Sequence, residues 1–309
     1  MNITVKKSKI SGEIAVPGSK SHTIRGVAAA LCSNGTSKLI APLIAEDTLS
    51  ALNAAKILGA EVIRHEDRWE ITAKGGPVAP AGVINMNNSG TGTRILAAVC
   101  ATCNGAVTFD GDASLRTRPM GQLLNALAQL DVQVESNNGK CPFTLTGPAQ
   151  AGKVTVDGTS SQFLTALLFL TPQLDGESDI EVVNLNEQPY VEMTLAWLDR
   201  LGVKYCMPQG DMTRFVIPGN QQFKPFETII PADFSTAAFP LGAAAVTGSS
   251  LNIRNLDFSD TQGDKAVFEY FELMGTKIDR GNEITTVTGP ERLKGVTFDL
   301  NATPDALTI

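Results

Sequence analysis

The feature that most constrains the fold of this chain is a repeat of about 72 residues. Four segments share one amphipathic pattern, with apolar residues three and four positions apart, which predicts a helix followed by a short alternating strand. These segments are ALNAAKILGAEV, LLNALAQLDVQV, TLAWLDRLGVKY and VFEYFELMGTKI. The predicted helices end at Gly59, Asp131, Gly202 and Gly275, which lie 71 to 73 residues apart. At the three glycines the left-handed turn that commonly ends a helix is easily adopted.

A second series of predicted helices alternates with the first. Its members are rich in small residues and apolar on nearly all sides, which predicts that they are buried. They are TIRGVAAALC, TRILAAVCATC, QFLTALLFLT and STAAFPLGAAAV. Short polar stretches precede them at residues 19–21, 88–91, 159–162 and 233–235. A fifth start of the same kind stands in NATPDALTI, with Asp305 at the corresponding place.

The repeating unit is therefore strand, buried helix, strand, amphipathic helix and strand, which predicts the α/β fold class. We expect three complete units in a first domain, residues 15–227. Residues 1–14 and 228–309 are expected to form a second domain that holds one full unit and part of another. Because Ile309 stands where a buried helix should begin, we expect a truncated chain. The second domain should then be softly packed, or completed by a partner.

Charge and hydropathy exclude several classes of protein. The chain has 25 Lys and Arg against 32 Asp and Glu, a net charge of −7, which argues against nucleic-acid binding. No apolar stretch reaches the roughly 18 residues that span a bilayer, and the amino terminus lacks the apolar block of a signal peptide. We therefore expect a cytoplasmic protein with no membrane partner.

Cysteine and histidine usage gives no sign of a metal site. Cys100 and Cys103 form a C-x-x-C, but it lies inside the apolar run ILAAVCATC with no second pair nearby. Buried, unreactive thiols are the favoured interpretation, and a redox or zinc site is the alternative. His22 and His65 are the only histidines, too few for a histidine-rich site.

The polar starts of the buried helices can be simple helix caps. The positive charges near these helix starts favour an anion-binding role instead. Lys20, Arg25 and Arg94 lie near the amino termini of predicted helices, where a cation opposes the helix dipole unless an anion is present. Gly90 and Gly92 allow a ligand to approach the backbone N–H groups closely.

The loop GDASLRTRPMG adds Arg116 and Arg118 before another predicted helix. Two solvated arginines are the alternative interpretation. Together with the helix starts, they favour recognition of phosphate and carboxylate groups. Nucleotide binding through a P-loop is disfavoured because Ser19 separates Gly18 from Lys20, and no G-x-G-x-x-G opens a helix.

Seven motifs, in order, resemble the 5-enolpyruvylshikimate-3-phosphate synthase (3-phosphoshikimate 1-carboxyvinyltransferase) family of enolpyruvyl transferases. They are VPGSKSHTIR, NNSGTGTR, LRTRPMGQLL, VDGTSSQFLTALL, QPYVEMTL, QGD and NATPDA. The resemblance implies two domains built from α/β repeats, with the active site in the cleft between them. It also implies a place in chorismate and aromatic amino acid biosynthesis, and a monomer for a chain of full family length.

The resemblance implies that phosphoenolpyruvate donates its enolpyruvyl group to the 5-hydroxyl of shikimate 3-phosphate, with no metal or organic cofactor. It assigns catalytic roles to Asp305, as the base beside the 5-hydroxyl, and to Lys20, as a proton carrier. The implied substrate-binding residues are Lys20, Ser21, Arg25, Gly90, Arg118, Ser160, Ser161, Gln162 and Tyr190.

The implied binding roles divide between the two substrates. Lys20, Gly90 and Arg118 are expected at phosphoenolpyruvate. Ser21, Arg25 and residues 160–162 are expected at shikimate 3-phosphate, with Gln162 reaching both substrates. One position departs from the family pattern: Glu187 stands where the family usually has a serine before x-P-Y, which places a carboxylate near a phosphate subsite.

Three alternatives remain open. One is a phosphate-binding fragment without catalysis, which measured turnover would exclude. Another is an enolpyruvyl transferase acting on a UDP-amino sugar, which would usually carry a reactive cysteine in the loop that matches GDASLRTRPMG, and none is there. The last is a nucleotide kinase, disfavoured by the loop mismatch described above.

Overall fold

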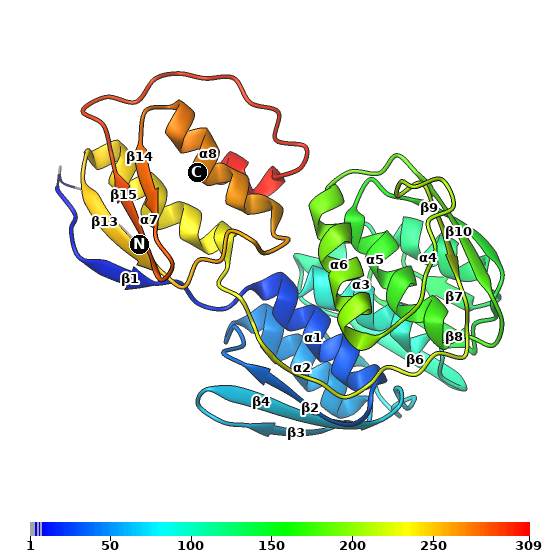
Figure 1. The fold of residues 1–309 in the computed structure, drawn as a ribbon. Coiled ribbons are helices and arrows are strands. Elements are labelled where there is room, and N and C mark those ends of the chain that lie inside the picture. Colours follow the sequence, from blue (N-terminus) through cyan, green and yellow to red (C-terminus); the bar gives the residue numbers. More distant parts are fainter. Residues whose placement is uncertain (1–3, 5, 7) are drawn as a thin grey trace. The chain divides into compact units, whose positions relative to one another are not determined.

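The computed structural model describes residue 4, residue 6 and residues 8–309, and it divides into two compact units (Figure 1). The larger unit is Lys20–Ile230, and the smaller unit combines Met1–Ser19 with Pro231–Ile309. The repeat pattern predicts these boundaries a few residues earlier, after residues 14 and 227.

The larger unit holds three repeats. The first contains α1 (Lys20–Cys32), β2 (Asn34–Ile40), α2 (Glu46–Ile57), β3 (Glu61–Arg64) and β4 (Arg68–Lys74). The second contains β5 (Ile84–Asn85), α3 (Gly90–Cys100), β6 (Gly105–Asp110), α4 (Gly121–Ala128), β7 (Gln133–Ser136) and β8 (Phe143–Gly147). The third contains β9 (Lys153–Asp157), α5 (Ser161–Leu170), β10 (Ser178–Val183), α6 (Gln188–Leu201) and β11 (Arg214–Ile217).

The smaller unit repeats the same order once. Its elements are β1 (Glu13–Ala15), α7 (Phe234–Thr247), β13 (Ser250–Arg254), α8 (Ala266–Leu273), β14 (Lys277–Arg280) and β15 (Ile284–Thr288). One further strand, β12 (Glu227–Ile229), precedes it. Single 3₁₀ turns lie at Leu115–Thr117, Thr171–Gln173, Gly263–Lys265 and Pro304–Thr308. The expected α/β class is confirmed.

Each sheet of the described residues combines one parallel strand pair with antiparallel neighbours. The strand orders are β12-β2-β4-β3, β5-β6-β8-β7 and β11-β10-β9 in the larger unit, and β1-β13-β15-β14 in the smaller one. The parallel pairs β5–β6 and β9–β10 each enclose one buried helix in a β-α-β connection.

Two strands are exchanged between the units. β1 precedes α1 in sequence but pairs with β13 of the smaller unit, Ile14 opposite Ile253. β12 precedes α7 but pairs with β2 of the larger unit, Thr228 opposite Leu39. The exchange explains the observed boundaries, because each strand stays with the sheet that it completes.

Two sequence predictions fail locally. The strand expected in LGVKY after α6 is reduced to one bridge between Cys206 and Val216. The helix start expected at Asp305 is the short 3₁₀ turn Pro304–Thr308. In the first case, the side-chain amide of Gln221 pairs with the backbone N–H and C=O of Lys204 and takes the place of a neighbouring strand.

The helices of the small-residue series differ in burial between the units. In the larger unit α1, α3 and α5 are buried along most of their length, as predicted, because they pack on one another and on the amphipathic helices. Helix α7 is an exception: Phe239 is 61% exposed and Val246 71% exposed. Among the described elements, its main contacts are with two strands of the sheet of its own unit, with α8 and with two 3₁₀ turns. The prediction that this helix is buried on all sides is therefore wrong.

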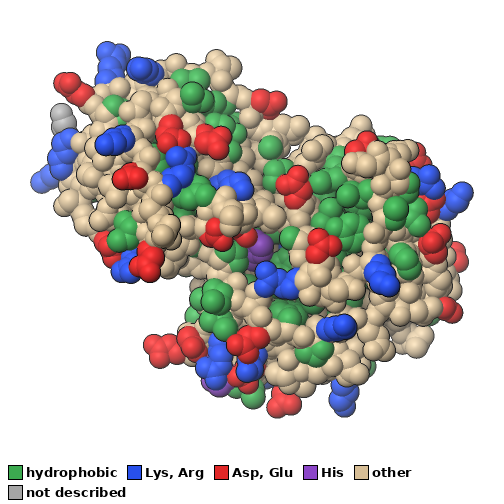
Figure 2. Space-filling view, viewed as in Figure 1, with side chains coloured by type: hydrophobic (Ala, Val, Ile, Leu, Met, Phe, Trp, Pro, Cys, Tyr) green, Lys and Arg blue, Asp and Glu red, His purple; other side chains and the backbone are tan. Residues whose placement is uncertain are grey.

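Charge on the visible surface is mixed in sign. Figure 2 shows acidic and basic side chains interspersed, rather than gathered into a patch of one sign. The described part of the chain contains no group of His, Cys, Asp and Glu side chains that could hold a metal ion. Cys100 and Cys103 are both buried, whereas Cys206 is exposed. None of the described helices has the length and apolar character needed to cross a bilayer.

Because α1 is closely packed at Gly26, adding a single methyl group there should lower stability. A Cβ on Gly26 would lie 2.7 Å from Cδ2 of Leu39 and 3.2 Å from Cη2 of Trp197, both buried. We expect Gly26→Ala to lower the free energy of unfolding by about 1–3 kcal/mol, because the clash outweighs the gain in helix propensity. Urea unfolding monitored by tryptophan fluorescence measures this change. Gly152→Ala, with open space around its Cβ, is the control and should shift stability by less than about 0.5 kcal/mol. Equal stability of both variants would contradict this packing.

Candidate functional site

Arg25 is buried where α1, α5 and α6 pack together, with 1% of its surface exposed. Its Nε donates to Oγ1 of Thr194 (2.9 Å), and Nη1 donates to the carbonyl of Ser21 (3.2 Å). Its Nη2 donates to the carbonyl of Tyr190 (2.9 Å) and to Oγ1 of Thr165 (3.3 Å). These acceptors are all neutral. Burial lowers the pKa of Arg25 to about 10, which means that the charged form is costly here and that a nearby anion would stabilise it.

Arg94 is a second buried cation, 9% exposed, on the first turns of α3. Its Nη1 donates to Oε1 of Gln162 at the start of α5 (2.6 Å), and Nη2 donates to the carbonyl of Pro119 (3.0 Å). Its guanidinium also lies over the ring of Phe163. Its Nε is buried and has no hydrogen-bond partner among the described residues. Arg94 thus joins the starts of α3 and α5 while one of its donors stays unused.

Arg118 lies directly against the first residue of α3. A Cβ on Gly90 would be only 2.7 Å from Nη1 of Arg118, so glycine is what allows this approach. Arg118 also donates to Oδ1 of Asn88. The cap residue Ser89 is fully buried, and its Oγ has no partner within the described part of the chain.

These contacts define a cationic cluster, which consists of Asn88, Gly90, Arg94, Arg118 and Gln162. Burial, and then the neighbouring charge of Arg118, lower the pKa of Arg94. The guanidinium groups of Arg94 and Arg118 both lie near the amino terminus of α3, which is the positive end of its dipole. This arrangement destabilises the protein unless an anion binds. The chemistry of the cluster fits a phosphate or carboxylate group.

The start of α5 already holds an anion from the chain itself. Oε2 of Glu187 accepts from the backbone N–H of Ser161 (3.1 Å) and from its Oγ (2.7 Å). Ser160 caps the helix, its Oγ accepting from the N–H of Gln162 (3.4 Å). The sequence flags Glu187 only as a departure from the family serine. Its contact with Ser161, 26 residues away, follows from the packing of α5 against α6.

The start of α1 places the remaining predicted residues of the larger unit. Lys20 and Ser21 begin the helix and are partly buried. Sequence reasoning assigned no role to His22, whose Nδ1 accepts a hydrogen bond from Nε1 of Trp197 on α6 (3.0 Å). The contact fixes the packing of α1 against α6 next to Lys20.

Within the described part of the chain, neither Asp305 nor Arg116 forms a hydrogen bond with these residues. Asp305 belongs to the smaller unit, where it is exposed in the 3₁₀ turn Pro304–Thr308. Arg116 forms an exposed, two-pronged ion pair with Asp110, which lowers the pKa of that carboxyl. Of the two arginines in the loop, only Arg118 contributes to the cationic cluster.

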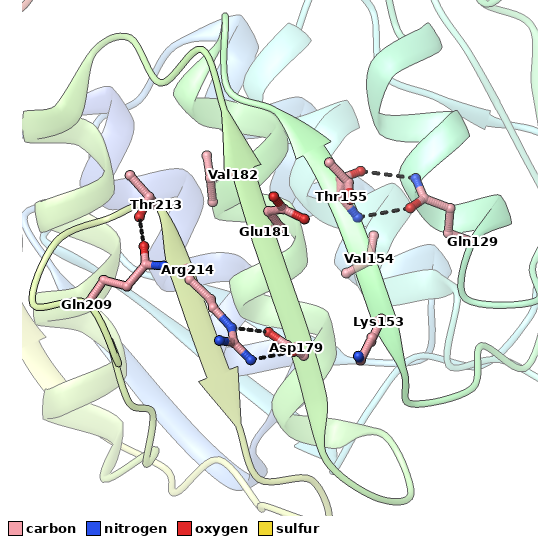
Figure 3. A pocket seen from close by; sticks show the side chains of 10 residues that line it. All are labelled: Gln129, Lys153, Val154, Thr155, Asp179, Glu181, Val182, Gln209, Thr213 and Arg214. Atoms are coloured by element: carbon pink, nitrogen blue, oxygen red, sulfur yellow. Dashed lines mark hydrogen bonds and ion pairs between the residues drawn. The ribbon is translucent and has the colours of Figure 1, made fainter.

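A separate depression lies on the outer face of the β9, β10 and β11 sheet (Figure 3). Several of its polar groups pair with one another, and Arg214 forms two hydrogen bonds with Asp179, each 2.8 Å. The side chain of Gln129 pairs with the backbone N–H and C=O of Thr155 and covers the edge of β9. None of the predicted site residues lines this depression.

Comparison with known proteins now identifies the family. The sequence model of EPSP synthase (3-phosphoshikimate 1-carboxyvinyltransferase) matches residues 5–309. The chain belongs to the EPSP synthase family. Among its relatives, the 3-phosphoshikimate 1-carboxyvinyltransferase of Acetivibrio thermocellus is 41% identical over 310 residues, covering 99% of this chain and 73% of that protein. The enzyme of the same name from Methanosarcina acetivorans is 40% identical over 313 residues, covering 99% and 72%.

The fold agrees with this family. An EPSP synthase structure from Acinetobacter baumannii superposes with a TM-score of 0.81 at 24% identity, covering 97% of this chain and 70% of that one. At this identity the superposition supports the fold alone, the two-domain enolpyruvyl transferase fold expected from the sequence.

The hydrogen bonds of Arg25 lead to a stability prediction. Because Arg25→Ala removes four hydrogen-bond donations and leaves a cavity among α1, α5 and α6, we expect it to lower the free energy of unfolding by about 3 kcal/mol. Urea unfolding of the two proteins measures the difference. The exposed arginine Arg64 on β3 provides the control, since Arg64→Ala should change stability by less than about 0.5 kcal/mol. Wild-type stability of Arg25→Ala would show that these bonds contribute nothing.

Proposed function

We propose that this chain transfers the enolpyruvyl group of phosphoenolpyruvate to the 5-hydroxyl of shikimate 3-phosphate and releases phosphate. The cationic cluster at the start of α3 is the observation that carries the proposal. It brings Arg118 and Gly90 together, and it links Arg94 to Gln162. Membership of the EPSP synthase family supplies the reaction to which this anion-binding chemistry corresponds.

Phosphoenolpyruvate is proposed to bind at the cationic cluster. Its phosphate would accept from Arg118 and from the N–H groups at the start of α3, where Gly90 leaves room for close approach. Lys20 would contact the same substrate from the start of α1. An anion here relieves the repulsion between Arg94 and Arg118, and it complements the helix dipole.

Shikimate 3-phosphate is proposed to bind at the starts of α1 and α5. Ser21, Ser160 and Ser161 offer hydroxyl groups, and Gln162 reaches the cationic cluster through Arg94. Tyr190, in the first turn of α6, is proposed as a further contact of this substrate. Arg25 is proposed to position this site, because its guanidinium donates hydrogen bonds to the carbonyls of both Ser21 and Tyr190 and so holds the starts of α1 and α6 together.

The proposed reaction is an addition followed by an elimination. The 5-hydroxyl attacks C2 of phosphoenolpyruvate while C3 is protonated, and loss of phosphate together with one C3 proton from the resulting ketal gives the enolpyruvyl ether. Asp305 is proposed as the base that takes the hydroxyl proton, and Lys20 as a proton carrier. The cations around both substrates stabilise the charge that develops on the departing phosphate.

Turnover tests this proposal most simply. The wild-type 309-residue chain should release inorganic phosphate from phosphoenolpyruvate only when shikimate 3-phosphate is present. Lys20→Ala and Asp305→Ala should each lower kcat by at least about 100-fold, because each removes a proton-transfer group. Asp299→Ala, which removes another exposed carboxylate of the smaller unit, should leave kcat unchanged. A kcat of Asp305→Ala within about threefold of wild type would exclude Asp305 as the base. Binding of both substrates without turnover would favour the fragment alternative.

The two arginines of one loop form a matched pair for testing phosphoenolpyruvate binding. Arg118→Ala should raise the Kd of phosphoenolpyruvate by at least about tenfold, because it removes a charged donor from the cationic cluster. Arg116→Ala removes the same charge two residues away, where it pairs with Asp110, and should change the Kd by less than about twofold. Calorimetric titration measures both constants. Equal effects of the two substitutions would mean that only net charge matters, and that Arg118 has no direct contact.

A further inference from the structure

The start of α5 is occupied by donors and acceptors of the chain itself. The N–H of Ser161 donates to Glu187, the N–H of Gln162 donates to Oγ of Ser160, and the N–H of Phe163 donates to the carbonyl of Ser160 (3.1 Å). The hydroxyl of Ser161 also donates to Glu187. The N–H groups that open this helix, and this hydroxyl, therefore already have partners.

The start of α3 is the opposite case. The guanidinium of Arg118 lies against Gly90, and the buried Nε of Arg94 and Oγ of Ser89 have no partner among the described residues. One helix start thus carries cations and unused donors, whereas the other carries a carboxylate. An anion from outside stabilises the first arrangement and competes with the carboxylate in the second.

Glu187 directs its side chain to α5 although its own backbone is in an unfavourable conformation. Glu187 is the cap residue of α6 and has left-handed backbone angles, φ 55° and ψ 40°, which are unfavourable for a glutamate. Its side chain does not cap α6. It reaches instead to Ser161, and its charge acts on Arg94, where it opposes the lowering of that pKa.

We propose that Glu187 is an internal anion that competes with the substrate phosphate at the start of α5 and thereby sets the specificity of this site. A phosphate oxygen can accept from Ser161 only after the Glu187 carboxylate has moved away. Glu187 therefore weakens binding of a phosphorylated alcohol but has little effect on the same alcohol without phosphate. This inference rests on the proposed function for the identity of the alcohol, shikimate 3-phosphate against shikimate.

Two neutral replacements test the role of the charge. Glu187→Gln keeps an oxygen that can accept from Ser161, so α5 remains capped. Glu187→Asn shortens the side chain and suits left-handed backbone. The matched control is Glu192→Gln, which removes one exposed carboxylate from the same helix, α6.

Calorimetric Kd values for shikimate 3-phosphate and shikimate, at one fixed ionic strength, are the measurement. Glu187→Gln and Glu187→Asn should bind shikimate 3-phosphate at least about tenfold more tightly than wild type, because a like charge next to the phosphate is gone. Their Kd for shikimate should stay within about threefold, and Glu192→Gln should match wild type with both ligands. Unchanged or weaker binding of shikimate 3-phosphate by both variants, or equal tightening for shikimate, would overturn the inference.

A second probe separates this inference from the proposed function. Inorganic phosphate should raise the unfolding temperature of Glu187→Gln more than that of wild type or Glu192→Gln, since a ligand that binds the native state stabilises it. If no form of the protein binds shikimate 3-phosphate, the proposed function is wrong, and the phosphate shifts alone decide the role of Glu187. Equal shifts of the unfolding temperature in all three proteins would then exclude competition between Glu187 and phosphate.

Discussion

Two buried guanidinium groups, those of Arg25 and Arg94, are the constraint on which the larger unit depends. A cation removed from water is costly unless acceptors surround it. Here carbonyls and hydroxyls from α1, α5 and α6 hold Arg25, and Gln162 and Pro119 hold Arg94. These neutral acceptors satisfy the donors of Arg25 and all but the Nε of Arg94, and they do not neutralise either charge. The same packing that holds the helices together therefore leaves a positive site at the start of α3, which suits anionic metabolites.

The small-residue helices make this arrangement possible. Gly26 lets α1 approach Leu39 and Trp197, and Gly90 lets Arg118 reach the first residue of α3. Glycine in these helices thus allows close helix packing at one position and the approach of a site arginine at another. In the smaller unit the same kind of helix, α7, leaves Phe239 and Val246 exposed, because only one sheet and a few short segments pack on it. A buried helix of this series needs neighbours on all sides, as α1, α3 and α5 have.

Local pattern was sufficient to predict most elements and to single out candidate site residues. The period of about 72 residues, the polar helix starts and the arginines next to them are properties of neighbouring residues, so they could be inferred before any fold was known. Contacts between residues that are distant in the sequence could not be inferred in this way. The pairing of β12 with β2, the bond from Trp197 to His22, and the contact of Glu187 with Ser161 all join segments that only the packed fold brings together. For Arg116 and Arg118 the local charge pattern alone could not tell a surface ion pair from a site residue, because the decision depends on where Asp110 and Gly90 lie; only the family resemblance singled out Arg118.

Hydrogen–deuterium exchange of the wild-type chain, with and without shikimate 3-phosphate and phosphoenolpyruvate, tests the central claim directly. If the amino-terminal ends of α1, α3 and α5 hold the anionic substrates, peptides covering residues 20–25, 90–94 and 161–165 should exchange more slowly when both ligands are present. Protection confined to other segments, such as the outer face of β9, β10 and β11, would contradict the account, as would no protection at saturating ligand.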